Sequence, residues 1–114
     1  MSLERVLKTL QSFGFAKRDA EVYIYLAKKG PRNPLEIASA LRIRRHHLLR
    51  ILKKLQAKGI VTASPEQPVY FSALAFEKTL DLLVKTNIKQ AKSIKETKQQ
   101  LLSNWRDLTK QNST

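Results

Sequence analysis

The sequence lacks cysteine, has few acidic residues and contains no long apolar run. Without cysteine, the chain can form neither disulfides nor thiolate metal sites. No apolar stretch approaches the roughly 20 residues that a membrane-spanning helix needs. Residues 2–13 alternate charged and apolar side chains, which is unlike a signal peptide. We therefore expect a cytoplasmic protein without a membrane partner.

The residue patterns typical of enzymes are also missing. The nine acidic residues are scattered, and we find no carboxylate pair, no nucleophile next to a base and no glycine-rich phosphate loop. The two histidines, His46 and His47, are adjacent. Adjacent helical positions do not face each other, so this spacing is poor for a shared metal ion. We expect neither catalysis, nor a metal site, nor a cofactor.

Positive charge is abundant. The 114 residues include 22 Lys and Arg, giving a formal net charge of +13. Such an excess predicts an anionic partner, either nucleic acid, an anionic membrane surface or an acidic protein. Residues 42–58 carry seven of these cations and no acid. Since solubilising faces usually mix both signs, this concentration favours a nucleic-acid contact.

Apolar residues recur at helical spacing through the first half of the chain. We expect helices over residues 3–13, 17–29, 34–41 and 44–58. The third has a clear start signal, because Asn33 can cap it, Pro34 suits its first position and Glu36 lies three residues after the cap. Gly59 ends the fourth helix.

A small hairpin follows these helices. Residues 60–61 and 69–71 are β-prone and flank the turn-forming segment 64–68, which contains two prolines. The expected fold is mainly α with a small β-hairpin: a winged helix-turn-helix domain over residues 1–75, followed by a long C-terminal helix within residues 76–114.

No Gly or Pro occurs between residues 74 and 108, so one helix on the order of 50 Å long is the simplest prediction. Apolar residues near its end would be costly to leave in water. We expect them to pair with a second chain as a homodimeric coiled coil, although Asn87 and Lys98 interrupt the seam. The alternative is a solvated helix packed only through its first half. The predicted dimerisation residues are Ile94, Leu101, Leu102, Trp105 and Leu108.

The helix over residues 44–58 has the pattern of a DNA-recognition helix. Leu48, Ile51, Leu52 and Leu55 form one apolar stripe, and basic residues occupy the opposite face. We expect Arg44, Arg45, His46, His47 and Arg50 to contact bases, and Arg42, Lys53 and Lys54 to contact phosphates. In the hairpin tip, Gln67 is a candidate groove contact, and a purely structural hairpin is an equal alternative.

Several short motifs occur in order along the chain: Phe13-Gly14-Phe15, Ala20-Glu21-Val22-Tyr23 with Leu26, Gly30-Pro31, Leu35-Glu36-Ile37-Ala38, Leu52-Lys53-Lys54-Leu55 and Lys58-Gly59-Ile60-Val61. Together they resemble the DNA-binding domain of TrmB-like archaeal transcriptional regulators over about residues 10–75. The resemblance implies operator binding, an archaeal source, a homodimer and a recognition role for Arg45, His46, His47 and Arg50.

The sequence departs from that family in three ways. Leu49 stands where the family usually has Tyr, and the hairpin lacks the family's basic residues. Larger members carry a C-terminal sugar-binding domain, whereas this sequence ends after the expected helix, so we expect no small-molecule ligand.

Three functional hypotheses follow. The first is a transcriptional regulator that binds double-stranded DNA as a homodimer. The second is an architectural nucleoid protein that binds DNA with little sequence preference, which the lysines at 85, 89, 92, 95 and 98 favour. The third is a protein-interaction module, which would bind DNA weakly and with shallow salt dependence.

Overall fold

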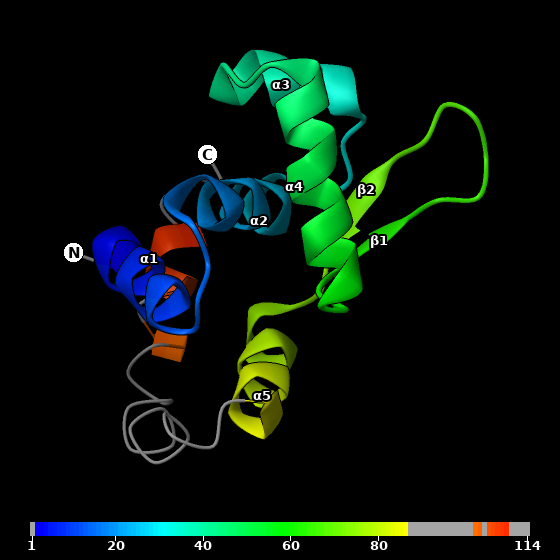
Figure 1. The fold of residues 1–114 in the computed structure, drawn as a ribbon. Coiled ribbons are helices and arrows are strands. Elements are labelled where there is room, and N and C mark those ends of the chain that lie inside the picture. The colour runs from blue at the N-terminus through cyan, green and yellow to red at the C-terminus, as the bar shows by residue number, and fades with distance from the viewer. Residues whose placement is uncertain (1, 87–101, 104, 110–114) are drawn as a thin grey trace. The chain divides into compact units, whose positions relative to one another are not determined.

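The computed structural model describes residues 2–86, 102–103 and 105–109 (Figure 1). The chain divides into two compact units. The central unit is Arg18–Leu74, and the terminal unit combines Met1–Lys17 with Ala75–Thr114. The elements in order are α1 Ser2–Ser12, α2 Lys17–Lys29, α3 Pro34–Leu41, α4 Arg45–Ala57, β1 Val61–Ala63, β2 Phe71–Ala73 and α5 Phe76–Thr86.

The four helices predicted from the first half of the sequence are confirmed. The bounds of α2 and α3 agree with the prediction, α1 begins and ends one residue earlier, and α4 is one residue shorter at each end. The core of the central unit comes from the apolar faces of its helices and from the hairpin. Its largest fully buried side chains are Tyr23, Leu26, Ile37, Leu48, Ile51, Leu52, Leu55 and Ile60.

The start of α3 has the predicted capping box. The backbone N–H of Glu36 donates to Asn33 Oδ1 at 2.9 Å, and the backbone N–H of Asn33 donates to Glu36 Oε1 at 3.0 Å. Pro34 occupies the first turn. Such a cap contributes about 1 kcal/mol, and it fixes where α3 begins.

Three residues, Arg42 to Arg44, connect α3 to α4. Arg42 adopts the left-handed conformation with φ 56° and ψ 48°, and its backbone N–H donates to the Ala38 carbonyl. The N–H of Ile43 donates to the same carbonyl at 3.1 Å, and the Ile43 side chain is buried. A left-handed residue other than glycine is uncommon, and here it allows the tight reversal that separates the two helices.

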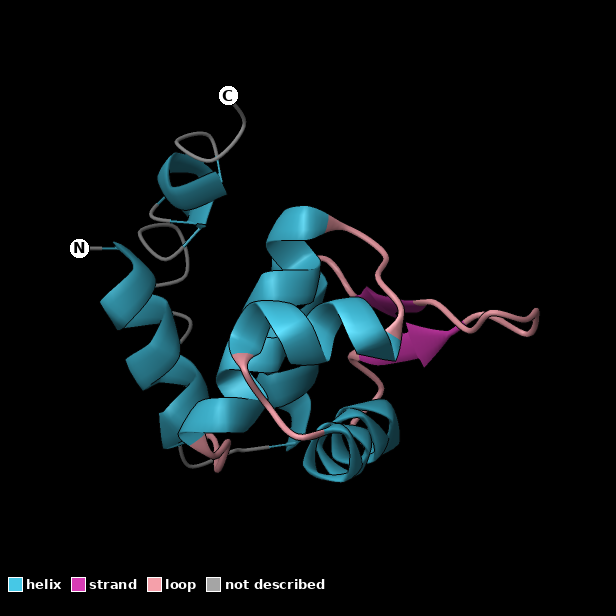
Figure 2. Cartoon of the chain, turned by 90° about the horizontal axis from the view of Figure 1, so that it is seen from above, coloured by secondary structure: helices cyan, strands magenta, loops and turns pink. Residues whose placement is uncertain are grey.

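The hairpin pairs β1 with β2 in antiparallel register, with Val61 opposite Ala73 and Ala63 opposite Phe71. The loop between the strands extends away from the helices of the central unit (Figure 2). The second strand begins two residues later than the β-prone segment 69–71 predicted, because Phe71 is the residue whose side chain is buried against the core.

A third extended segment joins the hairpin at one residue. Arg32 forms an isolated antiparallel bridge with Phe71, through N–H to carbonyl bonds of 3.1 and 2.8 Å. This bridge ties the link between α2 and α3 to β2. The link therefore positions the hairpin beside the helices.

The terminal unit contains α1, α5 and the described part of the C-terminal segment. The aromatic rings of Phe76 and Trp105 stack with centroids 4.9 Å apart. The single long helix expected over residues 74–108 is not shown: the structure describes α5 over Phe76–Thr86, and residues 87–101 lie outside the described residues.

This packing also bears on the predicted dimerisation residues. Leu102 and Leu108 are 8% and 5% exposed in the single chain, and Trp105 is half-buried. Ile94 and Leu101 lie outside the described residues. The dimer was expected because apolar side chains are costly to expose to water. Leu102 and Leu108 are already buried within one chain, so this reason does not apply to them. The dimer stays a prediction.

Candidate nucleic-acid interface

α4 presents one buried face and one exposed face. Leu48, Ile51, Leu52 and Leu55 are buried, as their spacing predicted. Every other residue of the helix is exposed. The candidate DNA-binding residues are all among the exposed residues of the central unit, namely Arg42, Arg44, Arg45, His46, His47, Arg50, Lys53, Lys54 and Gln67. The helix carries no acidic residue to neutralise its cations.

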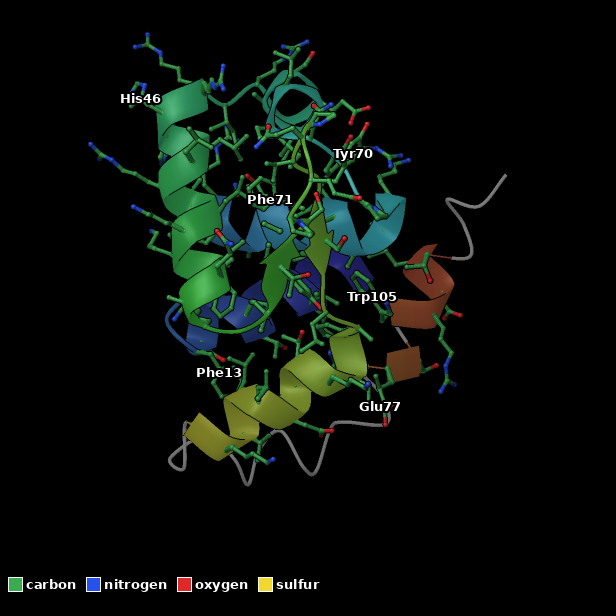
Figure 3. All side chains as sticks on the ribbon, turned by 90° about the vertical axis from the view of Figure 1, so that its right-hand side faces the viewer. Phe13, His46, Tyr70, Phe71, Glu77 and Trp105 are labelled. Carbon is green, nitrogen blue, oxygen red and sulfur yellow. The ribbon has the colours of Figure 1, made fainter. Side chains whose placement is uncertain are left out.

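The basic side chains of α4 differ in what they contact. His46, Arg50 and Lys53 line a groove of about 430 Å³ together with Leu49, Leu52, Gln56 and Phe71. Figure 3 shows His46 at the first turn of α4 and Phe71 on the hairpin beside that helix. We call the exposed surface of His46, Arg50 and Lys53 the basic face. The basic face offers two cations and a histidine, and the hydrogen-bonding side chain of Gln56 lines the same groove.

A second groove brings α4 and the hairpin tip together. Its volume is about 510 Å³. Arg45 from α4 and Gln67 from the tip both line it, so the structure unites two residues that the sequence could only name separately. The remaining lining residues are Asn33, Pro34, Leu35, Ala38, Leu49, Pro68, Val69 and Phe71.

Lys54 lines neither of these two grooves and forms an ion pair within the central unit. Its Nζ lies 3.1 Å from Asp19 Oδ2, at the first turn of α2. The side chain of Asp19 is 6% exposed and that of Lys54 is 56% exposed. His47 precedes Lys54 by seven residues and so shares its side of the helix. The spacing of the apolar stripe places His46, His47, Arg50, Lys53 and Lys54 on the outward face of α4, and all five are exposed.

The start of α2 supports both helices of the helix-turn-helix. Next to Asp19, Arg18 Nη1 donates to the carbonyl of Leu41 at the end of α3, at 3.2 Å, and pairs with Glu21 at 3.1 Å. Sequence reasoning missed these supporting residues. The contacts of Arg18 with Leu41 and of Asp19 with Lys54 join residues that are distant in the sequence, and no local motif predicts them.

Among residues 2–86, 102–103 and 105–109, no three His, Cys, Asp or Glu side chains gather in a way that would hold a metal ion. No helix in this part of the chain combines the length and apolar character needed to cross a membrane.

A short helix, a three-residue turn and a second helix with a basic exposed face, followed by an antiparallel hairpin, define a winged helix-turn-helix domain. Residues 10–77 match the family model of the sugar-specific transcriptional regulator TrmB. The match covers more than half of the chain, and the chain belongs to this family. The resemblance inferred from the motifs is therefore confirmed.

Three solved structures share the fold. The archaeal chromatin protein TrmBL2 aligns with 99% of this chain and 44% of its own length, at 21% identity and a TM-score of 0.69. The oxidised form of MarR from E. coli aligns with 96% of this chain and 84% of its own, at 17% identity and a TM-score of 0.56.

A second structure of MarR, the multiple antibiotic resistance repressor, aligns with 99% of this chain and 87% of its own, at 16% identity and a TM-score of 0.55. These identities show a likeness of fold alone. The chain spans less than half of the length of the TrmBL2 chain. No curated protein is significantly similar to the sequence.

Proposed function

We propose that the protein is a DNA-binding transcriptional regulator that inserts α4 into the major groove of duplex DNA. The observation that carries this proposal is the exposed, acid-free surface of α4, on which the basic face and Arg45 line two neighbouring grooves. A helix of this kind fits the major groove, whose base edges offer acceptors to guanidinium and imidazole donors. The supporting family is one of transcriptional regulators.

Within this proposal the cations have different roles. Arg44, directly before α4, and Arg45, His46 and Arg50, in its N-terminal half, contact base edges, as docking of such helices through their N-terminal residues requires. Arg42 and Lys53 bind phosphates, where charge matters more than geometry. Lys54 mainly holds Asp19, and His47 lies on the same side of the helix. Gln67 reaches the groove that it shares with Arg45.

We further propose that the protein acts as a homodimer through its C-terminal segment, since a two-fold axis would present two α4 helices to a palindromic site. Light scattering measures this directly. We expect a mass twice the 13.1 kDa of the chain. A mass of 13.1 kDa at the concentrations at which DNA is bound would refute the dimer.

A second candidate function is that of an architectural nucleoid protein with little sequence preference. TrmBL2, which shares the fold, is an archaeal chromatin protein with a mode of DNA binding described as novel. In this chain the hairpin segment 60–73 offers no cation for a second base-specific contact. Either function places the protein in the cytoplasm, at the nucleoid.

One titration separates these functions. The full chain is titrated against random genomic fragments and against its own upstream DNA, at two salt concentrations. Five or six phosphate contacts give a log–log slope of affinity against salt of about −5. Preference for some fragments that survives at the higher salt supports the regulator, and uniform binding that collapses with salt supports the architectural protein. Weak binding with a shallow slope would overturn both and favour a protein-interaction module.

A further inference from the structure

Leu49 is the one large apolar side chain on the exposed surface of α4, all of which lies in the described part of the chain. It is 40% exposed. The other exposed positions of the helix carry cations, histidines, Gln56 or the small Ala57. Single exposed leucines are common on protein surfaces. The position of Leu49 among groups that bind nucleic acid makes this one informative.

Leu49 forms the ridge between the two grooves of the interface, because it lines both. Arg45 precedes it by four residues and Lys53 follows it by four, so the three side chains form one stripe along the helix. An apolar side chain therefore stands between two hydrogen-bond donors. Phe71 also lines both grooves, and its buried ring provides an apolar background.

The base edges in the major groove offer hydrogen-bond donors and acceptors, and thymine adds an apolar C5-methyl group. A leucine carried into the groove between an arginine and a lysine gains free energy only where it removes apolar surface from water, so it needs an apolar group to pack against. The thymine methyl is the group in duplex DNA that meets this requirement.

We propose that Leu49 packs against the C5-methyl group of a thymine and makes the protein prefer thymine at that position. The inference rests on the proposed insertion of α4 into the major groove. It goes further by naming the residue that distinguishes thymine from the other bases and the chemical group that this residue recognises.

Replacing thymine with uracil removes only the C5-methyl group, so it tests the contact without changing base pairing. A genomic duplex that the protein binds is amplified once with thymidine triphosphate and once with deoxyuridine triphosphate. The dissociation constant of the full chain is then measured on both. We expect the parent protein to bind the uracil duplex about fourfold more weakly per methyl contacted, which corresponds to the burial of one methyl-sized group.

Two variants of Leu49 test whether the ratio of the dissociation constants on the uracil and thymine duplexes depends on this side chain. Leu49→Ala should bind both duplexes equally, and Leu49→Met, which keeps an apolar side chain of similar length, should retain the preference. Leu35→Ala is the matched control, because Leu35 is an exposed leucine that lines only the second of the two grooves described. It should leave the ratio of the parent unchanged.

The outcomes separate the inference from the proposed function. If the parent binds none of the genomic fragments, so that no such duplex is found, insertion of α4 into DNA fails, and the role of Leu49 fails with it. If the parent binds both duplexes equally, or if Leu49→Ala shows the ratio of the parent, the proposed function stands and the thymine contact is overturned. The measurement on the parent protein decides the inference even if a variant does not fold.

Discussion

Helix α4 and the hairpin lie side by side in the central unit but differ completely in charge. Residues 42–58, which include α4, contain seven cations and no acid. The hairpin segment 60–73 contains Glu66 and no cation. In a protein that binds DNA through phosphates and base edges, the free energy of binding is then concentrated in one helix. The hairpin contributes to the shape of the surface beside α4: Phe71 lines both grooves, and Gln67 lines the one that contains Arg45.

The largest effect is expected from the two arginines of α4. Arg45→Ala combined with Arg50→Ala should weaken DNA binding about 100-fold, because each guanidinium contact to a base contributes about 1–3 kcal/mol. Both side chains are exposed, so the variant should unfold at the temperature of the parent. Fluorescence anisotropy on a short duplex measures the affinity. Gln67→Ala, on the hairpin, is the matched control and should change affinity less than about threefold.

The contrast between α4 and the hairpin would be refuted if the double arginine variant bound DNA as tightly as the parent while Gln67→Ala bound it more weakly. The hairpin would then be the element that contacts DNA, and the assignment of α4 would be wrong.

An intermediate effect is expected from two adjacent lysines with different surroundings. Lys54→Ala leaves the buried Asp19 carboxylate without its partner, and it should lower the free energy of unfolding by about 1–2 kcal/mol, less than for a fully buried pair because Lys54 is half in water. Lys53 has no ion pair among the described residues, so Lys53→Ala should leave stability within about 0.5 kcal/mol and weaken DNA binding instead. Urea denaturation and anisotropy measure both quantities. Equal urea midpoints for the two variants would remove the structural role of Lys54.

The smallest effect is expected at the hairpin tip. Glu66→Lys replaces the acid of this segment with a cation, and it should strengthen DNA binding by a few-fold while steepening the salt slope by about 1. The measurement is the same titration at two salt concentrations. If neither affinity nor slope changes, the tip stays away from the phosphates and α4 binds alone.

Local signals in the sequence predicted the elements well. The capping box of Asn33 and Glu36 fixed the start of α3, and the apolar stripe of α4 predicted its buried face. Both signals act within one or two turns of helix, where spacing alone determines which side chains meet.

Contacts between residues far apart in the sequence were not predictable in this way. The pair of Asp19 with Lys54, the bridge of Arg32 with Phe71 and the stack of Phe76 on Trp105 each join distant residues. Each depends on tertiary packing that no local pattern encodes. For this reason the sequence supplied the list of candidate DNA contacts, whereas the groove lined by His46, Arg50 and Lys53 and the ion pair of Lys54 required the structure.

The absence of acids on α4 has a consequence for folding itself. Cations three or four residues apart on a helix repel each other, as Arg50 does with Lys53, so this repulsion lowers the stability of the uncomplexed helix. Added salt screens this repulsion and should stabilise the fold, although the same salt weakens the complex with DNA. Phosphates relieve the repulsion more directly by standing opposite the cations. We therefore expect the melting temperature of the domain to be highest when it is bound to duplex DNA. The phosphates of the duplex then supply the negative charge that α4 itself does not carry.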